Sequence, residues 1–243
     1  MTTSGTSTFN LNLNELVEEA FERCGVELRT GYDLRTARRS LNLLTIEWAN
    51  RGINLWTIEQ GSIPLTLGTI AYNLPVDTID LLDHVVRTGT GQNQIDINIT
   101  RISESTYSTI PNKNAQGRPI QVWINRQSGA DYPTTGVKNP TINIWPTANQ
   151  DSYYTFVYWR LRRIQDAGAG GTFTQDIPFR FLNCMVAGLA YYLSMKLPGV
   201  DPSRRAELKM DYEQQFQLAA DEDREKASLR LAPRVGYVGG GGW

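Results

Sequence analysis

The chain has 243 residues, of which 40% are hydrophobic and 20% are charged, and this balance excludes a disordered or low-complexity protein. Its formal net charge of −1 provides no overall basic field to hold DNA or an anionic membrane, so any DNA contact has to come from a local patch. The most apolar stretch, residues 179–193, is shorter than the ~20 residues of a membrane span, and no basic start leads into an apolar segment. We therefore expect a soluble protein that is made in the cytoplasm.

Two helices are predicted near the N-terminus. The first begins at Asn12, whose side chain can form a capping box with Glu15, and it ends at Gly25. The second begins near Asp33, has apolar residues at heptad-like spacing, and ends within residues 50–52. The face opposite its apolar stripe carries Arg35, Arg38 and Arg39.

From Ile53 onward the hydrophobic pattern alternates with a period of two, which is typical of strands. Candidate strands, separated by turns rich in glycine, proline and asparagine, lie at 63–67, 72–75, 95–99, 120–125, 141–145 and 153–164. The last candidate has apolar residues on both faces, so we expect it in the centre of a sheet or under a neighbouring subunit. Short strands with regular turns predict a small β-sandwich or barrel.

A glycine-rich hinge at 167–171 leads into a third helix, which we expect to be capped by Asp176 and to end near Lys196. This helix is apolar on nearly every face and must be buried on all sides. A second subunit would supply that cover most easily. A fourth helix begins at Asp201 and Pro202 and has only a narrow apolar stripe among charged residues.

These patterns predict an α+β protein in which N- and C-terminal helix pairs form a four-helix body, with an antiparallel β-sandwich or barrel-like domain inserted between them. The predicted divisions are an N-terminal helix pair at 1–52, an inserted β domain at 53–166, a C-terminal helix pair that completes the helical body at 167–230, and a flexible glycine-rich tail at 231–243.

No catalytic centre, metal site or cofactor site is predicted. His84, the single histidine, would need Asp83 or Asp80 to act as a general base, but no nucleophile motif lies near it and a structural role is favoured. Cys24 and Cys184 lie in predicted helices among apolar neighbours, which indicates two buried reduced thiols rather than a disulfide or a ligand pair. We therefore expect a protein that is not an enzyme and binds no cofactor.

Three sets of residues are candidates for contacts with other molecules. Large apolar or aromatic side chains on elements that need cover are candidates for packing between subunits: Phe179, Met185, Tyr191, Tyr192 and Trp159. Anchors on the flexible tail are candidates for docking on another protein: Leu231, Arg234, Tyr237 and Trp243. Clustered arginines either serve solubility and pairing with the acidic fourth helix or face DNA or an acidic partner: Arg35, Arg38, Arg39, Arg160, Arg162 and Arg163.

Several short motifs occur in a characteristic order along the chain. They lie at 41–56, at 63–75, at 144–147, and in the C-terminal pattern from 190 to 224. In this order they resemble the second helix, the first hairpin, the stretch before the last long strand, and the C-terminal helices of head-to-tail adaptor proteins of short-tailed phages. The resemblance covers most of the chain.

The resemblance implies a structural virion protein of the phage neck, made in the host cytoplasm, that takes part in DNA ejection. It implies a ring of twelve copies beneath the portal protein, which links the portal to a distal tail or nozzle protein and passes DNA through its lumen with non-specific contacts. It also implies that the C-terminal extension reaches onto the portal, and that no membrane is involved. Two alternatives stay open: a β-type module that binds host glycans on a helical oligomerisation base, and a wall-degrading hydrolase.

Overall fold

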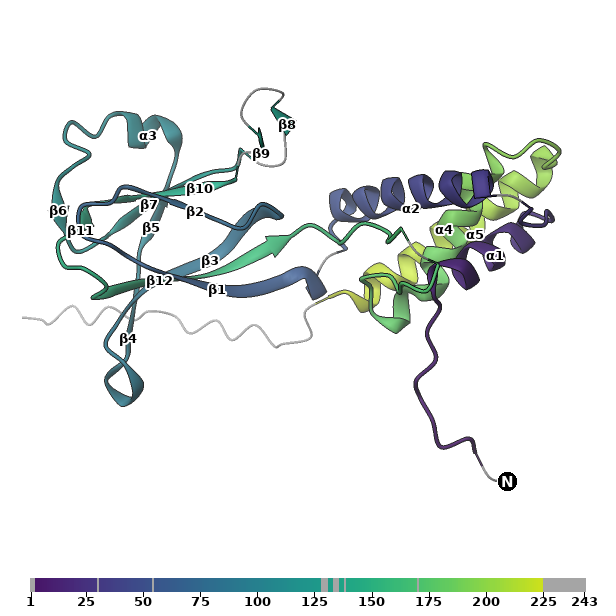
Figure 1. The fold of residues 1–243 in the computed structure, drawn as a ribbon, viewed down its shortest axis with the longest axis horizontal. Coiled ribbons are helices and arrows are strands. Elements are labelled where there is room, and N and C mark those ends of the chain that lie inside the picture. Colours follow the sequence, from purple (N-terminus) through teal and green to yellow (C-terminus); the bar gives the residue numbers. More distant parts are fainter. Residues whose placement is uncertain are drawn as a thin grey trace, which may run out of the picture.

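The computed structural model describes residues 3–29, 31–53, 55–127, 131–132, 136–137, 139–169 and 171–224. They form a helical part and a β part that lie side by side along the long axis (Figure 1). The helices in these ranges are α1 (Leu13–Arg23), α2 (Gly31–Arg51), α3 (Glu104–Ser108), α4 (Leu182–Ser194) and α5 (Pro202–Glu222), with 3-10 helices at Leu55–Thr57, Gly91–Asn93 and Phe179–Phe181. The strands are β1 (Ile58–Pro64), β2 (Ala71–Asn73), β3 (Thr78–Thr88), β4 (Ile95–Asn98), β5 (Thr100–Ile102), β6 (Gln116–Gly117), β7 (Gln121–Asn125), β8 (Asp131–Tyr132), β9 (Gly136–Val137), β10 (Thr141–Trp145), β11 (Thr147–Ala148) and β12 (Tyr154–Arg162).

Local capping sets where α1 and α5 begin, as predicted. Asn12 Oδ1 accepts a hydrogen bond from the backbone N–H of Glu15 at 3.0 Å, and Glu15 Oε2 accepts one from the N–H of Asn12 at 2.9 Å. Asp201 caps α5 by accepting from the N–H of Ser203 at 2.7 Å, and Pro202 opens the helix. Because each cap satisfies N–H groups that the helix leaves unpaired, both starts are encoded locally.

Helix α4 lies at the centre of the helical part and contacts α1, α2 and α5. Its Met185 and Leu189 are fully buried. A Cβ added at Gly188 would lie 2.9 Å from side-chain atoms of both Leu44 on α2 and Tyr212 on α5, so glycine permits the close approach of three helices. A second subunit, which the sequence favoured as the easiest cover, is not needed for most of this helix, because neighbouring helices of the same chain already bury it.

The β part contains two four-stranded sheets, with strand orders β1-β12-β3-β4 and β2-β10-β7-β5. β12 lies between β1 and β3, which confirms its predicted central position. One apolar cluster combines buried residues of both sheets, such as Phe156 and Val86 from the first and Val122 and Ile144 from the second. Neither sheet closes on itself within the described ranges, so the barrel alternative is wrong.

The β part also differs from the predicted antiparallel arrangement. β5 pairs with β7 in parallel, and so does β11 with β6. Helix α3 lies in the connection from β5 to β7, which is long enough to return the chain in the same direction. The sequence patterns missed both α3, which has five residues, and β3, in which Asp80, Asp83 and His84 interrupt the apolar alternation.

The predicted class is confirmed: helices from both ends of the chain flank a middle segment rich in strands. The two parts have separate apolar cores that share no residue. Ile53 and Ile164, inside the range predicted for the β domain, belong to the helical core. No helix in the described ranges is long and apolar enough to cross a membrane.

Candidate interaction surfaces

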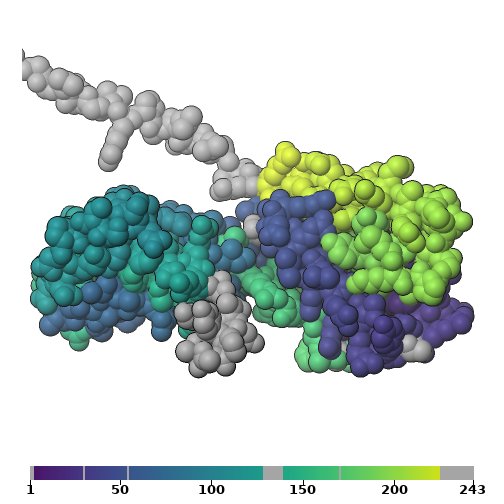
Figure 2. Space-filling view, turned by 90° about the horizontal axis from the view of Figure 1, so that it is seen from above, coloured from purple at the N-terminus to yellow at the C-terminus, as the bar shows by residue number. Residues whose placement is uncertain are grey.

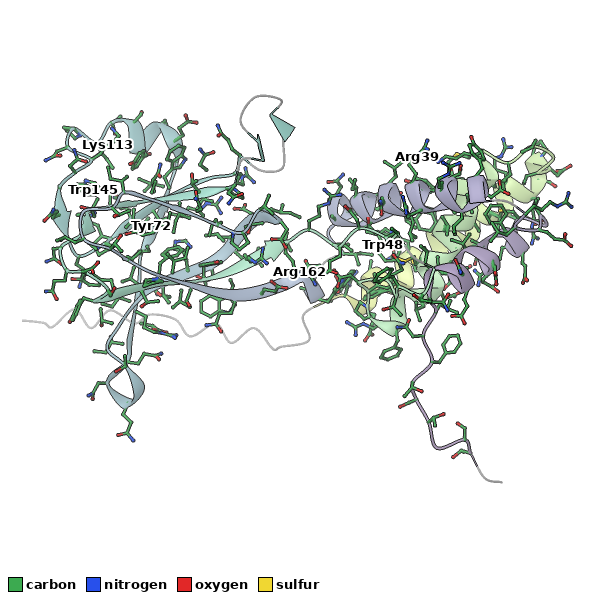
Figure 3. All side chains as sticks on the ribbon, viewed as in Figure 1. Arg39, Trp48, Tyr72, Lys113, Trp145 and Arg162 are labelled. Carbon is green, nitrogen blue, oxygen red and sulfur yellow. The ribbon has the colours of Figure 1, made fainter. Side chains whose placement is uncertain are left out.

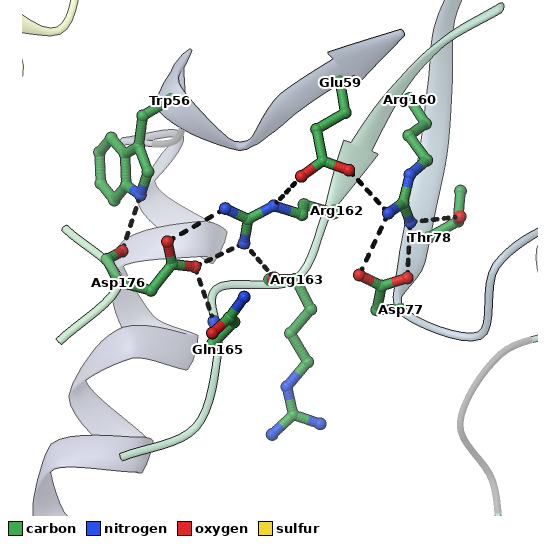
Figure 4. A network of polar contacts seen from close by, with 9 residues as sticks. All are labelled: Trp56, Glu59, Asp77, Thr78, Arg160, Arg162, Arg163, Gln165 and Asp176. Atoms are coloured by element: carbon green, nitrogen blue, oxygen red, sulfur yellow. Dashed lines mark hydrogen bonds and ion pairs between the residues drawn. The ribbon is translucent and has the colours of Figure 1, made fainter. Parts of the chain in front are cut away.

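A network of ion pairs lies where the β part meets the helical part (Figure 4). Arg160 and Arg162 are two residues apart on β12, so their side chains leave the same face of the strand. Glu59 on the neighbouring strand β1 bridges them: its Oε2 accepts from Arg160 Nη2 at 2.8 Å and its Oε1 accepts from Arg162 Nε at 2.6 Å. Arg160 also donates to the carboxylate of Asp77.

Asp176 extends this network into the helical part. Its carboxylate accepts from both terminal nitrogens of Arg162, with Nη2 to Oδ1 at 3.0 Å, and from the backbone N–H of Gln165 at 3.0 Å. Its backbone carbonyl accepts from Trp56 Nε1 at 2.9 Å. The prediction that Asp176 caps the third helix is therefore wrong, because its carboxylate instead ties the end of β12 to the segment that enters α4. We call Glu59, Asp77, Arg160, Arg162 and Asp176 the junction network.

The contacts of the junction network favour the charged forms of its two arginines and its two aspartates. The side chains of Arg160 and Arg162 are each 11% exposed. Burial opposes ionisation of Asp77 and Asp176, but hydrogen bonds from the arginines outweigh it and lower the pKa of both carboxyl groups. The hydrogen bond to Asp176 raises the pKa of Arg162. Such forked charge-assisted contacts have a defined geometry, so the network fixes how the two parts are oriented.

Only some of the arginines proposed to face DNA or a partner are available for that role in the structure. Arg160 and Arg162 are paired inside the chain and are not available for that role. Arg163 is different: its side chain is 54% exposed and pairs with Asp166 three residues on. A signal for the junction existed in the sequence, because two arginines on one face of a strand with apolar neighbours need carboxylate partners. The identity of those partners could not be derived, since they lie far away in the chain.

The arginines of α2 differ in exposure, and Arg39 points away from the helical core (Figure 3). Arg35 and Arg39 are exposed and Arg38 is half-buried, and none of them forms an ion pair with a residue in the described ranges. Two apolar side chains share the exposed side of the helix: Leu43 is 48% and Ile46 is 43% exposed.

The residues proposed for packing between subunits do not form one surface. Phe179 is 76% exposed, whereas Met185 is fully buried and has no surface to offer a neighbour. Tyr191 and Tyr192 are half-buried at the edge of the helical core, and Trp159 is half-buried on β12. The tail residues Leu231, Arg234, Tyr237 and Trp243 lie outside the described ranges.

His84 does not form the acid–base pair that a catalytic role requires. Its ring is buried against Phe156 with the centroids 5.8 Å apart, and neither ring nitrogen has a hydrogen-bond partner among the described residues. Burial lowers its pKa. Asp83 instead accepts from the backbone N–H of His84 at 2.8 Å, while Asp80 pairs with Arg101 at 2.9 Å.

The cysteines are free and buried, as predicted. Burial raises the pKa of Cys24 to about 11 and that of Cys184 to about 12, so both thiols stay protonated at neutral pH. Within the described ranges, no three side chains of histidine, cysteine, aspartate or glutamate are grouped so that they could hold a metal ion.

Two of the cavities that open on the surface bear on the candidate functions. One, of about 470 Å³, lies beside α1 and is lined by Phe9, by apolar residues of α4 and by four glutamates of α1. The other, of about 320 Å³, lies in the β part, where Trp123 is the single aromatic residue of its lining, beside Arg101 and Arg126. Both arginines pair with Asp80, and the remaining polar residues of the lining are Ser103, Glu104 and Asn125.

These features define an α/β protein whose helical and β parts are held together by an internally paired junction. The family model described as SU10 adaptor protein matches residues 11–235, which is nearly the whole chain. The chain therefore belongs to the SU10 adaptor protein family, a family of phage adaptor proteins. The resemblance to phage head-to-tail adaptors is thereby confirmed, and with it a role as a structural component of the virion. No curated protein matches the sequence.

Proposed function

We propose that the chain is one subunit of a ring of twelve copies that binds the portal protein and links it to a distal tail or nozzle protein. The match of the adaptor family model to residues 11–235 carries this proposal. The ring encloses part of the channel through which DNA is ejected, and the chain has no enzymatic activity. Its mechanism is the multiplication of weak contacts by ring closure, because each subunit is held by two neighbours.

The two parts have separate roles in this proposal. Residues 1–52 and 167–230 form a four-helix body that contacts the portal and the neighbouring copies. Residues 53–166 form a sandwich-like β domain that meets the next tail component. The junction network supports this division, because it holds the parts at a defined angle. The β3–β4 hairpin projects from the β part (Figure 1), and an ion pair between Arg87 Nε and Asp96 Oδ1 at 2.8 Å joins its two strands. This hairpin is a candidate contact for the next tail component.

Some candidate contact residues keep their proposed roles. Phe179 packs between subunits, joined at the rim of each helical part by Tyr191 and Tyr192. Arg163 and the α2 arginines face DNA or an acidic partner. The tail at 231–243 docks on the portal, with Trp243 as its terminal anchor.

Electron microscopy of the purified chain, alone and mixed with portal protein, tests the ring. We expect twelvefold particles in the mixture, whether or not the chain assembles by itself. Failure of the full-length chain to bind portal particles would refute the portal-binding role. A chain ending at residue 230 should bind the portal more weakly while its helical circular dichroism stays unchanged, and equal binding would refute docking by the tail.

One observation favours the alternative of a glycan-binding module, namely the cavity beside Trp123 in the β part. An aromatic ring beside polar groups is a common sugar-binding arrangement, although here a single ring lines the cavity. Binding of host-surface glycans that is lost in Trp123→Ala, together with threefold rather than twelvefold particles, would support this alternative over the adaptor ring.

A further inference from the structure

The exposed side of α2 is built like a helix that packs against a partner. Exposed residues follow one another at steps of three and four, so they lie on one stripe. The members of this outer stripe are Tyr32, Arg35, Arg39, Leu43 and Ile46. Tyr32 is 67% exposed, a large aromatic surface to leave in water. Figure 2 shows α2, in blue, uncovered on the side that faces the viewer.

The outer stripe carries uncompensated positive charge. Arg35 and Arg39 form no ion pair with any residue in the described ranges. Lys196 lies beside them, where its Nζ donates to Ser40 Oγ at 2.7 Å. Burial is the main cause that lowers the pKa of Lys196, and repulsion from the nearby charge of Arg39 adds to it. A carboxylate brought to this stripe would relieve that repulsion.

A groove with the opposite charge lies beside α1. It has a volume of about 470 Å³, and its apolar lining includes Phe9, Leu182 and Val186. Four glutamates of α1 and Arg23 line it as well, but Glu15 is engaged in the cap and Glu19 pairs with Arg23.

Glu18 and Glu22 are exposed, and neither forms an ion pair with a residue in the described ranges. They are four residues apart, so two like charges are adjacent on one helix face, which destabilises an isolated helix. Phe9 at the mouth of the groove is 75% exposed. The groove therefore presents apolar surface beside two carboxylates that lack a cation, and the outer stripe presents apolar surface beside two cations that lack a carboxylate.

The two surfaces lie on opposite sides of the helical part. Arg39 is on the upper side in Figure 3, and the N-terminal segment that carries Phe9 leaves the lower side in Figure 1. One chain therefore cannot join them to each other. Two different complementary surfaces on one subunit produce a head-to-tail contact, and such contacts form rings when the rotation closes.

We propose that the outer stripe of α2 in one copy docks into the acidic groove beside α1 in the next copy, with Arg35 and Arg39 paired to Glu18 and Glu22. This inference rests on the proposed ring and names the surfaces that join its subunits. A second copy is favoured over DNA as the occupant of the stripe, because Leu43 and Ile46 would lie against phosphates in a DNA complex. In a protein groove the same side chains are buried against apolar residues.

Charge exchange in the full-length chain tests the pairing. Self-association is measured by sedimentation velocity up to about 1 mM, together with cooperativity of loading onto portal particles. The variants are Arg35→Glu/Arg39→Glu, Glu18→Arg/Glu22→Arg, and the combination of all four. Each double variant alone should weaken association or cooperativity at least about tenfold, because like charges then meet across the contact.

The combined variant, and an equimolar mixture of the two double variants, should recover association because opposite charges meet again. Lys209→Glu, an exposed reversal on α5 away from both surfaces, should behave as the wild type, and circular dichroism at 222 nm shows whether each variant is folded. Recovery without misfolding is an outcome that general destabilisation cannot produce.

The outcomes separate this inference from the proposed function. Double variants that associate and load like the wild type overturn the inference while portal binding stands. A wild-type chain that associates through these surfaces but does not bind the portal overturns the proposed function instead. A wild type that neither associates nor loads cooperatively overturns the pairing. Loss of binding to labelled duplex DNA in Arg35→Glu/Arg39→Glu, with self-association unchanged, would assign the stripe to DNA.

Discussion

The helical part and the β part of this adaptor are stabilised in the same way, but they are joined in a different way. Each part has its own apolar core, with Phe181 and Trp48 fully buried in one and Phe156 fully buried in the other. At the junction, by contrast, the strongest contacts are ion pairs of Arg160 and Arg162.

The difference indicates that apolar burial and charged hydrogen bonds have separate roles in this molecule. Burial of apolar surface is non-directional and depends mainly on area, so it stabilises each part without fixing an angle between them. Forked hydrogen bonds between guanidinium and carboxylate groups depend on direction. A protein that must hold two partners at a fixed angle gains from placing such contacts where its parts meet.

The largest effect is expected inside a core. Phe181 packs against Trp56 and Trp48, with ring centroids at 5.0 and 6.4 Å, and is fully buried. Phe181→Ala should lower the free energy of unfolding by about 3–5 kcal/mol, because it removes buried surface and leaves a cavity. Urea unfolding followed by circular dichroism at 222 nm measures this.

The matched variant Phe156→Ala sharpens the comparison of the two cores. Phe156→Ala should lower the free energy of unfolding of the β part by a similar amount. Peptide-resolved hydrogen exchange should show that each substitution mainly speeds exchange in its own part. If either one speeds exchange equally in both parts, the molecule unfolds as one cooperative unit and the two cores do not act separately.

An intermediate effect is expected at the junction. Arg162→Ala leaves Asp176 without its cation and leaves Glu59 with Arg160 alone. It should cost about 2 kcal/mol, less than a fully buried pair would, because Glu59 is 44% exposed. Small-angle X-ray scattering should show a wider range of particle dimensions as the parts lose their fixed orientation. Arg163→Ala is the control: its side chain is 54% exposed, and we expect a change below about 0.5 kcal/mol. Equal effects of the two substitutions would contradict the structural role of the junction.

Acid should weaken the junction before it affects the cores. The folded-state pKa values of Asp77 and Asp176 are lowered, so their contribution to stability is present above the ordinary carboxyl pKa of about 4 and is lost as the pH falls through the lowered values. The loss should be smaller than that caused by Arg162→Ala. Unfolding free energies from about pH 6 to about pH 3 measure it.

Asp176→Asn tests the source of this pH dependence. The variant should be less stable than the wild type at neutral pH. Its free energy of unfolding should also fall less on acidification, because one of the titrating carboxyl groups is gone. A wild type and a variant with parallel pH profiles would show that other carboxylates account for the acid sensitivity.

The smallest effect is expected at a helix start. Asn12→Ala removes the side-chain acceptor of the capping box on α1 but keeps the backbone N–H that donates to Glu15, and it should cost about 1 kcal/mol, detected as a shift of the urea midpoint. Thr8→Ala, an exposed change in the preceding segment, should leave the midpoint unchanged. A shift as large as that of Phe181→Ala would mean that α1 anchors the whole helical part.

Features with local causes were predictable from the sequence. The starts of α1 and α5 follow from Asn12 and Asp201, and the central position of β12 follows from its two apolar faces. The segment that became β3 was missed because its polar residues hide the alternation, and its pairing with β12 depends on residues about seventy positions away. Exposure of the candidate contact residues was not predictable either. Phe179 is exposed and Met185 is buried because of how the elements pack, not because of residue type.

The sequence by itself determined the class of the protein, the order of its four long helices around a strand-rich middle, and its membership of a phage adaptor family. Caps, periodicity and ordered motifs depend on residues that are close together in the chain. Only the tertiary structure decided that α4 is covered by its own chain and that Arg160 and Arg162 face inward. Both outcomes depend on which distant segments come together: Arg160 meets Asp77, and Arg162 meets Glu59 and Asp176. The charge of a side chain is known from its identity, but its partner is known only once the chain has folded.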